Sequence, residues 1–185
     1  MIEERNDRQL LWLQMGIAGG LILLAAVLRV VAHPWNFTPV GAMALFSGAT
    51  FRQRWLKFAF PLVALFAGDV LVGLYKLMCV IYASFLISVA IGMWIGEERK
   101  IVRLAGGTFL GALQFFLITN FGIWATFLTY PKTAAGLLSC YAAGLPLFWN
   151  TLAGDLCYVG LLFGGYALAK RLILRAPVEM TVNGV

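Results

Sequence analysis

The chain has 185 residues, of which 62% are apolar and 12% are charged, and its mean hydropathy is +0.88. Soluble domains contain about half apolar and about a quarter charged residues, so this composition excludes a water-soluble globular protein and predicts an integral membrane protein. A net charge of +6 would suggest a nucleic-acid partner in a soluble protein. We expect no nucleic acid here and a lipid bilayer instead, because the cations fall between long apolar segments.

Six apolar segments predict six membrane-spanning helices, since a helix needs about 20 apolar residues to cross the hydrocarbon. The first segment ends at His33 and Pro34. The second, which is short, and the sixth are predicted to begin at Pro39 and Pro146, because proline is favoured in the first turn of a helix. We expect one all-α, integral membrane six-helix bundle with spans at 10–32, 39–51, 55–74, 77–95, 104–128 and 146–169.

The Lys and Arg residues alternate between the two sides of these spans. Eleven of the 14 fall on one side, in the N-terminal tail, in the second-to-third and fourth-to-fifth connections, and in the C-terminal tail. The other three are Arg29, Lys76 and Lys132. Because cytoplasmic loops are enriched in Lys and Arg, the pattern predicts a multi-pass membrane protein with both termini in the cytoplasm.

Polar residues within the predicted spans gather in the extracytoplasmic half. An ionisable side chain in the membrane costs from about 2.5 kcal/mol upward, so each such group needs a reason. We interpret them, together with aromatic side chains nearby, as the walls of a substrate-binding pocket that opens to the outside. The candidate binding residues are Arg29, Asn36, Asp69, Asn120, Trp124, Tyr141, Asn150 and Asp155.

Several of these residues have a second interpretation. Asn120 and Trp124 are four residues apart, so they share one helix face and could meet the same ligand, but Trp124 is equally suited to the interfacial aromatic belt. Asn36 is a candidate N-cap of the second span. Arg29 could pair with Asp69 or Asp155 only to compensate a buried charge.

Small residues spaced by four occur in the first two spans. Gly16 and Gly20 form one such pair, and Ala44 and Gly48 form the other. This spacing lets helices approach closely in lipid. The contacts are either internal packing or a surface that docks a membrane partner.

Motifs for catalysis or cofactor binding are missing from the sequence. It contains no GxxxxGK[ST] run for phosphate binding, and His33 is the only histidine. We therefore expect no enzyme, no cofactor and no metal.

Three runs carry a resemblance: NFTPVGAMALFSGA, PLVALFAGDVLVGLY, and TNFGIWATFLTYPKTAAGLLSCYAAGLPLFWNTLAGDLCYVGLLFG. They resemble an uncharacterised family of small bacterial membrane proteins over roughly residues 34–166. The resemblance implies a place in the bacterial inner (plasma) membrane. More distantly, the six-helix plan is similar to the S-components of energy-coupling-factor vitamin importers, which hold a vitamin near the outer face and dock a coupling subunit driven by ATPases. That resemblance implies a docking role for Gly16 and Gly20. It implies a binding role for Asn120, Trp124, Asn150 and Asp155.

From these observations we expect a membrane transport protein that captures a small metabolite or vitamin-like solute at an extracytoplasmic pocket. It would depend on a membrane coupling subunit with ATPases for uptake. Two alternatives stay open. One is a membrane scaffold or assembly subunit with a filled interior, and the other is a proton-coupled carrier that acts alone, with Asp69 or Asp155 as the titrating group.

Overall fold

The computed structural model describes residues 12, 15–24, 27, 36–96 and 100–175. Every regular element in these ranges is a helix, as the apolar composition predicts. The six helices are Met15–Leu24, α2 (Val40–Thr50), α3 (Arg54–Val72), α4 (Met78–Ile95), α5 (Ile101–Thr126) and α6 (Ala134–Arg175).

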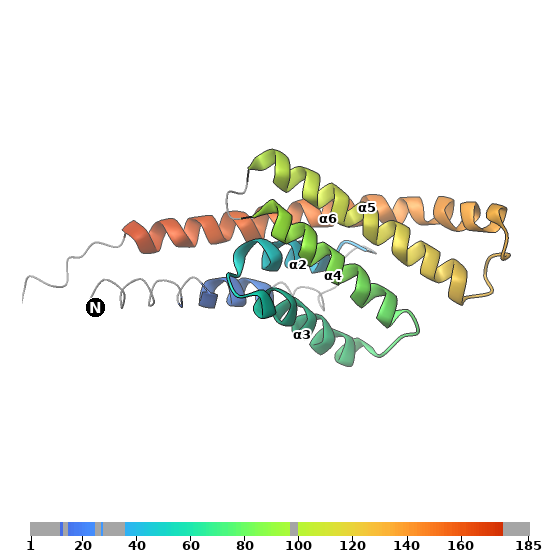
Figure 1. Ribbon diagram of the computed structural model, residues 1–185, viewed down its shortest axis with the longest axis horizontal. Helices are drawn as coiled ribbons and strands as arrows, with labels where there is room; N and C mark the ends of the chain where they lie inside the picture. Colours follow the sequence, from blue (N-terminus) through green and yellow to red (C-terminus); the bar gives the residue numbers. More distant parts are fainter. Residues whose placement is uncertain (1–11, 13–14, 25–26, 28–35, 97–99, 176–185) are drawn as a thin grey trace, which may run out of the picture.

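The second to fifth predicted helices are confirmed in place, with ends shifted by a few residues. Of the predicted first span, 10–32, the structure describes the helix Met15–Leu24 and two further residues. That helix and the C-terminal end of α6 lie toward the same end of the molecule (Figure 1). The cytoplasmic placement of the termini stays a prediction.

The predicted start of the sixth helix is wrong. The helix α6 begins at Ala134 and continues through Pro146, which lies in its interior. The start signal is Thr133, whose Oγ1 accepts a hydrogen bond from the Gly136 N–H at 3.1 Å, as an N-cap side chain does. Pro146 instead removes one backbone N–H within the helix, a defect that membrane helices tolerate.

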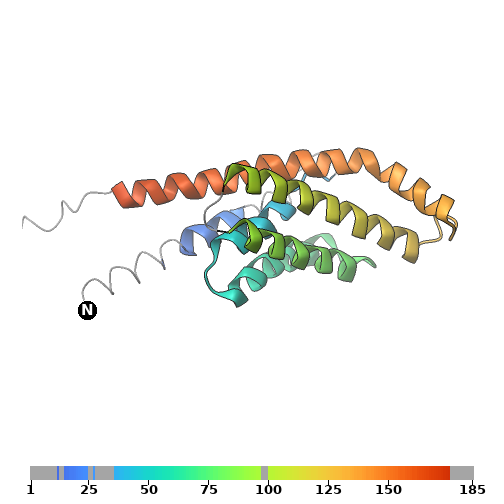
Figure 2. The same ribbon diagram turned by 45° about the horizontal axis from the view of Figure 1, so that its top comes forward.

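The helix α6 is also longer than one bilayer crossing. Its 42 residues extend over about 63 Å, roughly twice the hydrocarbon thickness. It pairs with α5 in a hairpin whose turn lies beyond the ends of α3 and α4 (Figures 1 and 2).

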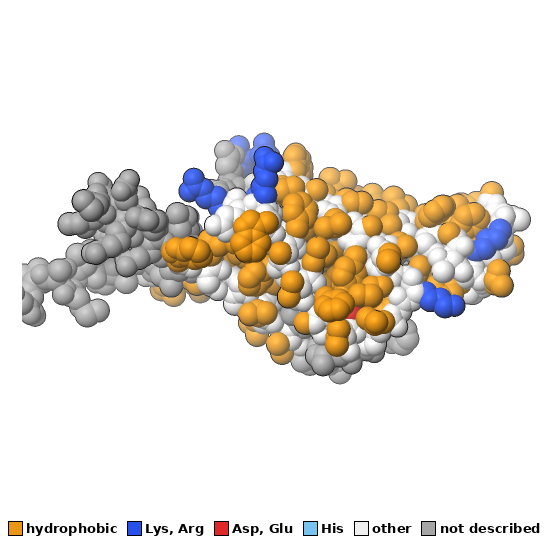
Figure 3. Space-filling view, turned by 60° about the horizontal axis from the view of Figure 1, so that its bottom comes forward, with side chains coloured by type: hydrophobic (Ala, Val, Ile, Leu, Met, Phe, Trp, Pro, Cys, Tyr) orange, Lys and Arg blue, Asp and Glu red, His pale blue; other side chains and the backbone are white. Residues whose placement is uncertain are grey.

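Three described segments are long and apolar enough to cross a membrane: Met78–Ile95, Ile101–Thr126 and Ala134–Leu172. At most 33% of the residues in their most apolar windows are buried inside the molecule, so most of this apolar surface points outward. On the face shown in Figure 3, Lys and Arg side chains gather toward two ends, with a largely apolar surface between them. This distribution suits a protein surrounded by lipid.

The centre of the bundle is α2, which has only 11 residues and is about 16 Å long. It is therefore too short to cross the hydrocarbon. Almost all of its residues are buried, and it contacts α3, α4, α5 and α6. A short helix enclosed in this way places its N-terminal N–H groups inside the protein rather than in water.

The small residues of α2 are used in internal packing. A Cβ on Gly48 would meet the backbone of α4, 2.9 Å from the Met93 nitrogen, and a Cβ on Gly92 would lie 2.9 Å from the Leu45 Cα. Ala44 is fully buried in the same region. By contrast, Gly16 and Gly20 are exposed, and among the described residues no atom outside their own helix backbone lies within 4 Å of a Cβ built on either.

Candidate functional site

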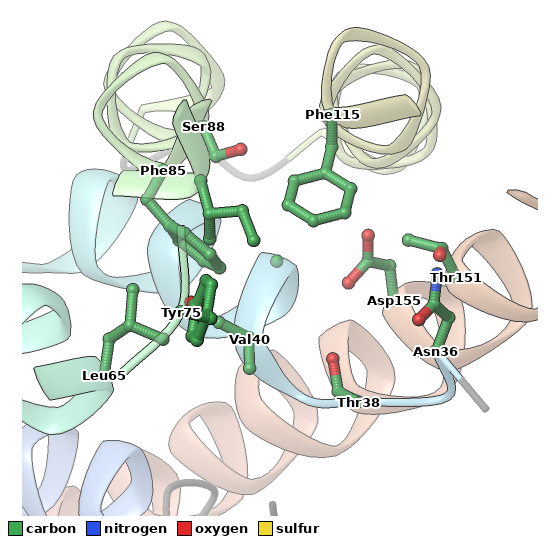
Figure 4. Close-up of a pocket in the computed structure, with 13 residues that line it drawn as sticks. Asn36, Thr38, Val40, Leu65, Tyr75, Phe85, Ser88, Phe115, Thr151 and Asp155 are labelled. Atoms are coloured by element: carbon green, nitrogen blue, oxygen red, sulfur yellow. The ribbon is translucent and has the colours of Figure 1, made fainter. Parts of the chain in front are cut away.

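A cavity of about 130 Å³ lies at the N-terminal end of α2. One water molecule needs only about 10–15 Å³ of such volume, so the cavity can hold several waters or one small organic molecule. Its walls come from the segment before α2 and from every helix from α2 to α6 (Figure 4). The lining residues are Asn36, Thr38, Val40, Gly41, Leu65, Tyr75, Ile81, Phe85, Ser88, Gly111, Phe115, Thr151 and Asp155.

Asp155 is the charged group of this lining. Its side chain projects from α6 into the cavity (Figure 4), although the residue is only 2% exposed. Its Oδ1 accepts a hydrogen bond from the Ala42 N–H at 3.1 Å. This N–H belongs to the first turn of α2, where the helix dipole favours a negative charge. No other hydrogen bond or ion pair joins Asp155 to the described part of the chain.

The interpretation of Asn36 as an N-cap is wrong, because Pro39 occupies the N-cap position of α2. Proline has no side-chain oxygen with which to cap the helix. The carboxylate of Asp155, 113 residues away in the sequence, accepts the Ala42 N–H instead. Asn36 has a φ of 61°, which asparagine tolerates better than most residues, and it lines the cavity beside Asp155.

Asp69 is fully buried but is not among the lining residues. Its Oδ2 accepts hydrogen bonds from the hydroxyl groups of Tyr75, at 3.2 Å, and Tyr82, at 2.9 Å. Tyr75 does line the cavity. Asp69 therefore does not face the cavity itself, but its hydrogen bond positions Tyr75, one of the aromatic side chains of the lining.

Three other candidate residues lie in the α5–α6 hairpin, outside the described lining. The Asn120 side chain donates to the Phe116 carbonyl at 2.8 Å, and the Tyr141 hydroxyl donates to the Leu117 carbonyl at 2.9 Å. The Trp124 indole donates to the Pro131 carbonyl at 2.9 Å. Asn150 is exposed one residue before Thr151 and is not part of the lining, and Arg29 lies outside the described residues.

Lys132 stabilises the turn of this hairpin through two hydrogen bonds. Its ammonium donates to the carbonyls of Trp124 and, at 2.7 Å, of Phe127, and it lies 5.4 Å from the centre of the Trp124 ring. The buried thiol of Cys140 donates to the Asn120 carbonyl at 3.4 Å. The two hydrogen bonds of Lys132 satisfy carbonyls at the C-terminal end of α5, where a cation is favoured.

We predict that Lys132→Ala destabilises this turn by about 1 kcal/mol, because the last carbonyls of α5 lose a charged donor. The expected readout is faster proteolysis in residues 127–133 of the detergent-solubilised protein. Lys76→Ala is the matched control, since Lys76 is an exposed turn lysine without a hydrogen bond to any described residue. Equal proteolysis of the two variants would contradict the role of Lys132.

A polar network between α4 and α5 was missed by the sequence interpretation. The Gln114 amide donates to the Ser88 hydroxyl at 2.9 Å and to the Ser84 carbonyl at 3.2 Å, and it accepts from the Ser84 hydroxyl at 3.0 Å. Ser88 also lines the cavity. The signal was present, because Ser84 and Ser88 are four residues apart and therefore share one helix face.

Among the residues that the structure describes, no group of three or more His, Cys, Asp or Glu side chains could hold a metal ion. The described cysteines, Cys79, Cys140 and Cys157, are free thiols. The arrangement can bind a small molecule through one carboxylate, several neutral polar groups and aromatic rings.

Residues 10–177 match the model of a family of unknown function, DUF6580. The chain belongs to this family. The match covers the three sequence runs that resemble an uncharacterised family of membrane proteins. The family description assigns no activity to its members. No curated protein and no solved structure matches the chain.

Proposed function

We propose that this protein is a membrane transport protein that binds a small metabolite or vitamin-like solute in the cavity at the N-terminus of α2, without catalysis. The observation that carries the proposal is Asp155, a buried acid whose side chain projects into that cavity. Burying a carboxylate among apolar helices costs several kcal/mol. One hydrogen bond to α2 offsets only part of this cost, and a bound solute with a donor group would offset more.

The cavity supports solute binding over a scaffold, for which we would expect a filled interior. It lies at the end of a half-length helix, an arrangement that transporters use to bring backbone groups to a substrate inside the membrane. The same buried acid also suits a carrier that couples transport to protons. Uptake by protein in liposomes without any partner would distinguish the carrier from a binding subunit.

In the proposal, the protein resides in the bacterial inner membrane with both termini in the cytoplasm, and a coupling subunit supplies the energy. Gly16 and Gly20 support the presence of a partner, since their exposed face would let another helix approach closely. Ala44 and Gly48 are less suited to this role, because α4 covers them.

Thr151→Val tests the proposal together with Thr108→Val as a matched control. Both threonine hydroxyls donate to the carbonyl four residues earlier, Leu147 and Leu104, but only Thr151 lines the cavity. We expect Thr151→Val to weaken solute binding about fivefold, since a neutral hydrogen bond contributes about 1 kcal/mol. Thr108→Val should bind as the wild type does.

The measurement is native mass spectrometry of the protein purified in mild detergent, which reports the small molecule retained by each variant. Lower occupancy in Thr151→Val alone supports the cavity as the binding site. If wild-type protein purified without a retained molecule also fails to take up any solute from a metabolite extract, the proposed function is refuted.

A further inference from the structure

The described lining of the cavity contains an acidic side chain but no basic one. Among the described lining residues there is one acid, Asp155, and there is no Lys, Arg or His. The Asp155 carboxylate makes one hydrogen bond to the described part of the chain, through Oδ1, and this leaves Oδ2 to a ligand. An anionic ligand would meet a buried negative charge with no described cation beside it, which is strongly unfavourable in an apolar interior.

A helix N-terminus usually attracts anions, but here that position is already occupied. The first turn of α2 receives the carboxylate of Asp155, and Gly41 makes room for it, since a Cβ at this position would lie 2.6 Å from Oδ2. The protein's own acid thus replaces an anionic ligand. It also presents a negative surface to whatever lies in the cavity.

The two halves of the cavity differ in chemistry (Figure 4). Asn36, Thr38 and Thr151 gather around Asp155 on one side and offer oxygen acceptors. The other side is mainly apolar and aromatic, with the rings of Tyr75 and Phe85 together with Val40 and Leu65, and the Ser88 hydroxyl lies beside Phe85. The Phe115 ring lies between the two sides. Aromatic faces attract cations as well as apolar groups.

We infer that the solute is a small organic cation, an ammonium group joined to a compact apolar or aromatic body. This inference rests on the proposed function and names its substrate class. The ammonium would donate to Asp155 and the neighbouring oxygens, and the body would fill the aromatic half. A bare metal ion fits less well, because the hydroxyl oxygens on the aromatic side, those of Tyr75 and Ser88, already form hydrogen bonds within the protein, and the apolar part of the cavity would stay unfilled.

The test uses full-length protein in lipid nanodiscs and fluorine NMR of fluorinated benzylammonium. Matched probes are fluorinated benzyl alcohol, which is neutral, and fluorinated benzoate, which is an anion. We expect saturable binding of the ammonium alone. Asp155→Asn, which keeps the shape and the acceptor for the Ala42 N–H, should weaken it about ten- to a hundredfold, the range expected for a charged hydrogen bond.

Two further variants distinguish a loss of binding at the site from a loss caused by misfolding. Phe115→Leu, in the aromatic wall, should weaken benzylammonium binding several-fold, and Thr108→Val, outside the lining, should leave it unchanged. Equal binding of the alcohol and the ammonium, or an unaltered affinity in Asp155→Asn, would overturn the cation class but leave solute binding intact. Displacement of the ammonium by sodium at equal concentration would assign the site to an inorganic ion, and binding of none of the three probes would also overturn the inference.

Discussion

Gly92→Ala is expected to lower the free energy of unfolding by about 3 kcal/mol, the upper part of the range for an overpacked core. A Cβ at Gly92 would lie 2.9 Å from the Leu45 Cα and also too close to the Leu45 carbonyl. These are backbone atoms of α2, so no side-chain rotation can relieve the contact. The helices α2 and α4 would have to move apart, and α2 is the centre of the bundle. Thermal unfolding in mild detergent measures the loss.

Gly48→Ala should have a similar effect, because its Cβ would meet the Val89 carbonyl and lie 2.9 Å from the Met93 nitrogen. Gly160→Ala is the matched control within α6. Among the described residues, no atom outside the backbone of α6 lies within 4 Å of a Cβ at Gly160, so this substitution should stabilise the helix by about 0.5–1 kcal/mol. A Gly92→Ala protein as stable as the Gly160→Ala protein would show that α2 and α4 do not cross as described.

Much of the fold could be predicted because apolar runs are separated by charged or turn-forming residues. The limits of α2 to α5 follow from this contrast, and the structure places them within a few residues of the prediction. The start of α6 could not be found in the same way, since Pro146 satisfies the rule for a first turn as well as Thr133 satisfies the rule for an N-cap. The packing of α6 against α5 and the Thr133 cap favour the longer helix.

The site was predicted in part, and the reason is energetic. A buried acid is costly enough to be noticed in a sequence, so Asp155 was named, and with Asn36 it lines the cavity. Ser88 and Thr151 were not named, because hydroxyl groups can bond to their own helix and carry little cost in a membrane. Thr38, in the segment before α2, was not named either. The spacing of Asn120 and Trp124 predicted that they share a helix face. It could not predict whether that face contacts the cavity or another part of the protein.

Gly41→Ala is expected to weaken binding of benzylammonium at least about tenfold while the bundle stays folded. The added methyl group would occupy the space of the Asp155 carboxylate, 2.6 Å from Oδ2. A carboxylate is the mobile end of a side chain, so it can move away, and the Ala42 N–H then loses its acceptor. The cavity keeps its rings but loses the position of its charge, and fluorine NMR titration measures the resulting affinity.

Gly106→Ala in α5 is the control, since no atom of another described helix lies within 4 Å of a Cβ there. The sharper comparison is a double-mutant cycle with Asp155→Asn. If Gly41 acts by holding the carboxylate in place, Gly41→Ala should add little to the loss already caused by Asp155→Asn. Fully additive effects would mean that the methyl group obstructs the ligand directly, and Gly41 would then shape the cavity rather than position its charge.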